Sequence, residues 1–178
     1  MFGTFGGRLE TATETHFFQW FHLQPVASEP VEDGVKRYRP SGPSFKSEVA
    51  FDVTLDGEGN TVRLALHLAR GFIEDVRNGP FATDIACSFL SDVLPEMDRA
   101  ATEPLLVALQ REMVNRSTVI SRAGTIPEAR PLGEWSGALD VYYGRADVFE
   151  RALGHTRLAL RNGASGSGPE LQIIVNAR

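Results

Sequence analysis

VAFDVTLDGEGNTVRLALHLA, residues 49–69, alternates apolar with polar or small side chains on both sides of a glycine-rich turn. A period of two residues is typical of a strand with one buried face. Two such runs separated by a short turn predict a β-hairpin. The side chains expected on its buried face are Val49, Phe51, Val53, Leu55, Val62, Leu64, Leu66 and Leu68.

The register of this hairpin follows from the turn and from the charges on its outer face. A two-residue turn at 57–58 puts glycine first, as a type II′ turn prefers. It also pairs opposite charges across the strands, Asp52 with Arg63 and Glu48 with His67. Such pairs contribute a few tenths to about 1 kcal/mol to stability. A four-residue loop would lose the Asp52 pair, because it would place Asp52 opposite an alanine. We therefore expect the two-residue turn.

Two helices are expected after the hairpin. Asn78 can cap a helix, and Pro80 is tolerated in its first turn, where a missing N–H costs little. Apolar residues at helical spacing continue to Pro95. A second helix is expected from about 96 to 115, and Pro104 would kink it or begin a new one.

The sequence predicts mainly strands in the last third of the chain. We expect a short strand at 119–120, a loop over 123–134, a strand over 135–143 and a short helix from Asp147, where the spacing to Glu150 fits a capping box. Two further alternating runs, 156–160 and 171–175, flank a glycine- and serine-rich loop, so they should be antiparallel neighbours.

This order of elements predicts an α+β fold, with an antiparallel β-sheet of about five to seven strands and two or three helices packed on one face or end. The 178 residues fit a single domain, 1–178. Within it, residues 1–15 are expected to be a flexible start. Residues 25–44 contain four prolines and are expected to be a long irregular connection.

Composition excludes several common functions. A net charge of −5 without a basic run argues against nucleic-acid binding, which needs clustered Lys and Arg. A single cysteine, Cys87, excludes an internal disulfide framework, and its apolar neighbours indicate a core position. No run approaches the roughly 18 apolar residues of a membrane span. We expect no cofactor and no metal. A cytoplasmic location is expected by default, and a periplasmic or secreted one if a signal peptide has been removed.

The stretch HFFQWFHLQP, residues 16–25, is the most suggestive functional segment. His16 and His22 are six residues apart, and neither a strand nor a helix brings such a pair onto one metal ion. Aromatic density favours a strand, whereas a possible capping box at 11–14 and a stop at Pro25 favour a helix. We favour the strand. Both of its faces would be apolar, which indicates either a covered position or an interface. The candidate binding residues are Phe17, Trp20, Phe21 and His22.

A second group of candidates lies where the hairpin leads into the first long helix. Glu74, Asp75 and Arg77 stand together before Asn78. Polar residues at such a junction can bind or catalyse, and they can also satisfy backbone groups and cap the helix, which we favour.

From these observations we expect a non-catalytic binding or assembly domain that recognises a protein partner or a small apolar ligand, and a homodimer is compatible with it. The alternative is a small hydrolase-like enzyme with its site between the Glu74–Asn78 junction and the 123–134 loop. Neither interpretation includes nucleic-acid binding or a membrane span.

Overall fold

The protein folds around one seven-stranded antiparallel sheet in the order β1-β2-β3-β4-β7-β6-β5. The structure is a computed structural model, which describes residues 5–27, 31–42, 45–116, 131–166 and 168–178. The strands are β1 (Leu23–Pro25), β2 (Val35–Pro40), β3 (Val49–Leu55), β4 (Thr61–Ala69), β5 (Val148–Ala152), β6 (Thr156–Ser165) and β7 (Gly168–Ala177). The first four strands and the last three form two separate meanders, which meet where β4 pairs with β7.

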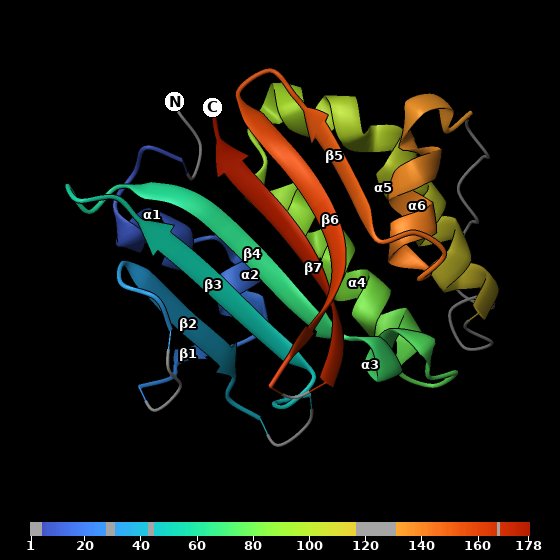
Figure 1. Ribbon diagram of the computed structural model, residues 1–178, viewed down its shortest axis with the longest axis horizontal. Coiled ribbons are helices and arrows are strands. Elements are labelled where there is room, and N and C mark those ends of the chain that lie inside the picture. Colours follow the sequence, from blue (N-terminus) through green and yellow to red (C-terminus); the bar gives the residue numbers. More distant parts are fainter. Residues whose placement is uncertain (1–4, 28–30, 43–44, 117–130, 167) are drawn as a thin grey trace.

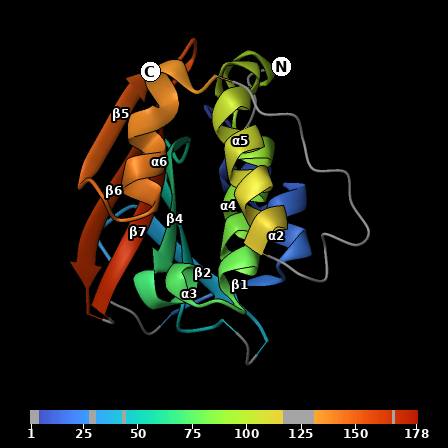
Figure 2. The same cartoon turned by 90° about the vertical axis from the view of Figure 1, so that its right-hand side faces the viewer.

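The helices lie on one side of this sheet, as Figure 2 shows for α2 to α6, and none of those that the structure describes covers the other side, which we call the open face. They are α1 (Leu9–Thr13), α2 (His16–Trp20), α3 (Arg70–Glu74), α4 (Gly79–Val93), α5 (Glu96–Arg116) and α6 (Ser136–Tyr142), with a 3-10 turn at Gly133–Trp135. Figure 1 shows the sheet in front of the helices. The expected α+β fold, with an antiparallel sheet and helices on one face, is confirmed. The described residues contain six α-helices, three of them only five residues long.

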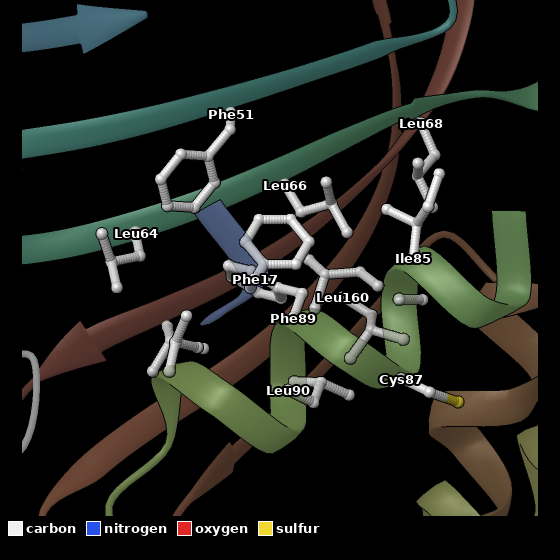
Figure 3. Close-up of a cluster of buried hydrophobic side chains, with 14 of the residues drawn as sticks. Phe17, Phe51, Leu64, Leu66, Leu68, Ile85, Cys87, Phe89, Leu90 and Leu160 are labelled. Atoms are coloured by element: carbon white, nitrogen blue, oxygen red, sulfur yellow. The ribbon is translucent and has the colours of Figure 1, made fainter. Parts of the chain in front are cut away.

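The core fills the space between the sheet and the helices. Phe17 of α2 contacts Phe51 of β3 and Phe89 of α4, with ring centroids 5.5 Å apart in both cases. All three side chains are almost completely buried. Figure 3 shows this cluster together with Leu66 of β4 and Leu160 of β6. Tilted and edge-on aromatic contacts of this kind add about 0.5–1.5 kcal/mol each to simple burial.

The hairpin of β3 and β4 forms as expected, but its predicted register is wrong. Asp52 lies opposite Ala65 and not opposite Arg63. The turn is longer than two residues because the Asp56 carboxylate accepts N–H bonds from Glu58 and Asn60, at 2.9 and 2.8 Å. The strand also bulges between positions 54 and 55. The hydrogen bonds of the turn therefore outweigh the two charge pairs of the predicted register.

The segment at 16–25 was expected to be a strand, and this prediction is wrong for most of it. Residues 16–20 form α2, whose first turn is capped by the Thr15 hydroxyl accepting from the Phe18 N–H. Only 23–25 are extended, as β1. Within the neighbouring stretch 25–44, where an irregular connection was predicted, Val35–Pro40 form the strand β2 and pair with β3.

The last third of the chain contains two further corrections. The predicted strand over 135–143 is instead helical: residues 136–142 form α6, and Trp135 belongs to the 3-10 turn before it. The buried positions Trp135, Ala138, Val141 and Tyr142 have helical spacing. Residues 148–152 form the edge strand β5 where a short helix was expected. The predicted strand at 119–120 and most of the 123–134 loop lie outside the described residues. The predicted antiparallel pairing of the last two runs is confirmed by β6 and β7.

The two long helices lie where the sequence predicts them, but no new helix begins at Pro104, which was one of the expected outcomes. α4 begins after Asn78 and ends before Pro95. α5 continues through Pro104 without a break. Cys87 is a buried residue of α4, and burial raises the pKa of its thiol to about 12, so it is a core residue as predicted. Within the described part of the chain, the helices are too short or too polar to cross a membrane.

Candidate functional site

The four aromatic-segment candidates line one pocket. Phe17, Trp20, Phe21 and His22 surround a space of about 290 Å³ between α2, the ends of β1 and β2, and α4. We call it the aromatic pocket. Its other lining residues are Leu23, Pro40, Ser41, Gly42, Phe45, Val49, Phe81, Asp84 and Ile85.

The helix α2 is fixed in place by its first turn. The Asp92 carboxylate on α4 accepts a hydrogen bond from the Phe17 backbone N–H. The same carboxylate lies 3.6 Å from Nδ1 of His16. The His16 ring in turn stacks on Trp20, with centroids 5.4 Å apart. Capping by Asp92 therefore sets the position of one pocket wall relative to α4.

Two walls of the pocket expose large aromatic side chains. Trp20 is 64% exposed and Phe81 is 56% exposed. Phe45 lies next to Phe81, with ring centroids 5.9 Å apart. Asp84 is the carboxyl group of the pocket, and burial raises its pKa. Exposed aromatic side chains beside an apolar hollow are typical of a surface that binds another apolar group.

Backbone strain is concentrated at the same pocket. Among the described residues, His22 and Phe45 are the non-glycine residues with positive φ, at 47° and 64°. Both line the aromatic pocket. The His22 carbonyl accepts a hydrogen bond from Ser41, and the Phe45 carbonyl accepts from the N–H of Val49, each at 3.1 Å. Left-handed backbone at such residues costs about 1–3 kcal/mol and is most often found at functional sites.

The Glu74, Asp75 and Arg77 candidates lie elsewhere, at the turn between α3 and α4. Glu74 pairs with Arg70, at 3.2 Å. The Asp75 carboxylate accepts the N–H groups of residues 77 and 78, both at 2.8 Å. Asp75 therefore satisfies backbone groups before α4. None of the three lines the aromatic pocket. The other half of the predicted enzyme site, residues 123–130, lies outside the described residues.

A buried ionic cluster on the open face of the sheet was not predicted. His67 of β4 lies between two carboxylates, with Nδ1 3.0 Å from Glu170 and Nε2 3.1 Å from Asp52. Arg37 donates two hydrogen bonds to Asp52, at 2.7 and 2.8 Å. A polar pocket of about 320 Å³ adjoins the cluster and is lined by Arg37, His67, Glu170 and their neighbours.

The charges of this cluster stabilise one another. Burial by itself raises the pKa of Asp52, but hydrogen bonds from Arg37 and His67 outweigh burial and lower it to about 2. Burial by itself lowers the pKa of His67, and the bonds to Asp52 and Glu170 outweigh it, so the pKa is raised. A carboxylate at each ring nitrogen favours the charged form of His67. We interpret the cluster as an electrostatic clamp across β2, β3, β4 and β7.

The sequence contains a signal for this cluster, which the predicted register concealed. Asp52 and His67 both belong to the outward set of the alternating hairpin. The observed register pairs Ala50 with His67, which places Asp52 diagonally across from the imidazole. Glu170 comes from the far end of the chain, and no local pattern connects it with the hairpin. Among the described residues, no group of three or more His, Cys, Asp or Glu side chains could hold a metal ion.

No family model matches the chain, and neither a curated protein nor a solved structure matches it.

Proposed function

We propose that this chain is a non-catalytic binding domain, which holds an apolar side chain of a partner protein or a small apolar ligand in the aromatic pocket. The observation that carries the proposal is the convergence of two strained residues, His22 and Phe45, and two exposed aromatics, Trp20 and Phe81, on one hollow.

The pocket is large enough for one bulky group but too small for an extended ligand. About 290 Å³ lies near the lower end of the range of about 300–1,000 Å³ for small-molecule sites. Trp20 and Phe81 would lose water on binding, and aromatic side chains of this kind carry much of the binding energy at interfaces. Asp84 supplies a polar group that orients the ligand.

An apolar dye provides the first test. Titration with the fluorescent probe anilinonaphthalene sulfonate should give saturable binding, and Phe81→Ala should weaken it at least about fivefold because it removes one wall. Met97→Ala is the matched control, since Met97 is 71% exposed and does not line the pocket. Equal losses in both variants, or no saturable binding, would contradict the proposal.

Intrinsic fluorescence gives a second readout. The chain has two tryptophans, of which Trp20 is 64% exposed and Trp135 is 3% exposed. In a Trp135→Phe variant, ligand binding should shift the Trp20 emission to shorter wavelength and reduce its quenching by acrylamide. Unchanged quenching at saturating probe would place the ligand away from Trp20.

A second copy of the chain is one candidate partner. Size-exclusion chromatography with light scattering would detect it as a dimer at micromolar concentration. Trp20→Ala should then return the chain to a monomer, whereas Met97→Ala should not. A monomer in every variant would leave a different protein, or a small ligand, as the occupant.

A further inference from the structure

The open face of the sheet carries a row of three polar side chains on adjacent strands. Arg63 of β4 pairs with Asn176 of β7, and Asn176 pairs with Arg157 of β6. We call these three residues the arginine row. Paired residues on antiparallel strands point to the same side of a sheet, so both arginines flank Asn176. Strands lie about 4.8 Å apart, which places the two arginine Cα atoms about 10 Å from each other.

The neighbouring row on the same face is small and apolar. It consists of Ala65, Ile174 and Ala159, which pair in the same order. Their exposed fractions are only 1%, 4% and 2%, although none of the helices in the described ranges covers this side. This row forms an apolar floor beside the arginine row, and arginine side chains commonly lay their aliphatic stems along such a surface.

The two arginines differ from the other cations of this face. Arg37 pairs with Asp52, and Arg161 pairs with Glu150. In the part of the chain that the structure describes, Arg63 and Arg157 have neither an ion pair nor a side-chain hydrogen bond. Arg157 is exposed and Arg63 is half-buried, so the row offers two guanidinium groups that lack a carboxylate partner among the described residues.

The open face also differs in charge from the rest of the chain. The strand residues that point outward include five arginines and three carboxylates, which gives +2 before His67 is counted. The whole chain carries −5. The eight charged residues that point outward from the strands are Arg37, Arg39, Arg63, Arg157, Arg161, Asp52, Glu150 and Glu170. A cationic face on an acidic protein favours a negatively charged partner through its field.

We propose that the open face is a docking surface for an acidic segment of a partner protein, with Arg63 and Arg157 binding its carboxylates. Guanidinium groups match carboxylates in a planar, two-pronged geometry, and two of them about 10 Å apart can grip one carboxylate or two neighbouring ones. The Asn176 amide lies between them as a further donor. This surface is on the opposite side of the sheet from the aromatic pocket, so the proposal does not depend on the function proposed above.

Charge distribution favours an acidic polypeptide over a polyphosphate. Asp52, Glu150 and Glu170 interrupt the cationic face, and a nucleic acid needs a continuous basic track to release its counterions. A short peptide can place its carboxylates on the arginines and avoid the acids. The apolar floor beside the row also suits a side chain that accompanies those carboxylates.

Fluorescence anisotropy with a labelled hexaglutamate peptide tests this proposal. At low salt, about 20 mM, the wild type should bind, and raising salt to about 200 mM should weaken binding strongly because the charges are exposed. Arg63→Gln/Arg157→Gln should weaken binding at least about tenfold. Arg77→Gln/Arg145→Gln is the control, since it makes the same charge change at exposed arginines off the open face, and it should stay within about twofold.

A further variant separates charge from folding. Arg63→Lys/Arg157→Lys keeps the charge and the aliphatic stem, so its affinity should lie between those of the wild type and the glutamine variant. Absence of hexaglutamate binding, binding that is insensitive to salt, or equal weakening in the control would overturn the proposal. Tighter binding of a thymidine hexanucleotide or of phosphatidylserine vesicles than of hexaglutamate would also overturn it, in favour of a nucleic acid or a membrane.

Discussion

Replacing Asp52 by asparagine removes the carboxylate that joins Arg37 to His67 and keeps its size. In the folded protein the pKa of Asp52 falls from an ordinary 3.8 to about 2, because hydrogen bonds from Arg37 and His67 outweigh the effect of burial. Each pKa unit corresponds to about 1.4 kcal/mol, so the ionised carboxylate contributes about 2.5 kcal/mol to stability at pH 7. Asp52→Asn should lower the free energy of unfolding by about that amount.

The sign of the pH dependence follows from the lowered pKa. The contribution is complete above pH 3.8, where the unfolded chain is also ionised, and it is lost as pH falls toward 2. At pH 3 about half of it should remain. Urea denaturation followed by circular dichroism should therefore show a difference between wild type and Asp52→Asn that is about twice as large at pH 7 as at pH 3.

A matched variant tests whether burial is the reason why the Asp52 carboxylate contributes so much to stability. Asp140 also pairs with an arginine, Arg145, at 2.8 Å, but the two side chains are 45% and 61% exposed. Asp140→Asn should cost no more than about 1 kcal/mol, since exposed ion pairs contribute little. A loss below about 0.5 kcal/mol for Asp52→Asn, or a loss that does not change between pH 7 and pH 3, would refute the electrostatic clamp.

Three further changes test other parts of the fold. Asp98 is 1% exposed and accepts hydrogen bonds from the 155–156 turn at 2.6–3.1 Å, so Asp98→Ala should lower the free energy of unfolding by about 3 kcal/mol, and a loss under about 1 kcal/mol in urea denaturation would contradict this. Bonds to Asp52 and Glu170 outweigh burial and raise the pKa of His67, so its contribution to the free energy of unfolding is complete below about pH 6.5 and is lost as pH rises through the raised value. The urea midpoint of the wild type should fall in that pH range, whereas the midpoint of His67→Gln should stay constant. Gly59 has φ of +83°, so Gly59→Ala should lower the thermal midpoint by an amount equivalent to about 1 kcal/mol, whereas Gly57→Ala, at an ordinary φ, should leave it nearly unchanged.

Long alternating runs made the sheet predictable. The hairpin over 49–69 and the last two strands contain enough apolar positions of period two to exclude a helix. The register was not predictable from charges, because hydrogen bonds to the Asp56 side chain determine the length of the turn. The cross-strand charge pairs expected from the sequence contribute at most about 1 kcal/mol each, which is too little to compete with these hydrogen bonds.

The short aromatic segments were not predictable for a different reason. α2 has five residues and α6 has seven, so neither covers enough turns to show a helical period clearly. Both are helical because tertiary contacts bury particular side chains, such as Phe17 under β3 and Tyr142 against Thr83. Local propensity for strand is overridden in such cases.

The candidate site was only partly accessible from sequence. Residues 17–22 could be chosen by their aromatic density, and the pocket contains them. The opposite walls come from residues 40–42, Phe45 and residues of α4, and no local pattern brings these to the same place. The His67 cluster depends in the same way on Glu170, which is more than a hundred residues away along the chain.

The seam between β4 and β7 has a consequence for how the chain folds. Each meander pairs strands that are neighbours in sequence, so each can form by closing short loops. The pairing of Leu66 with Ile173 instead joins residues that are more than a hundred positions apart in the chain. Closing so long a loop costs entropy before any contact compensates for it, so this pairing should form late. Native-state hydrogen exchange should then show two cooperative units, with the seam amides of β4 and β7 opening before the hairpins on either side of them.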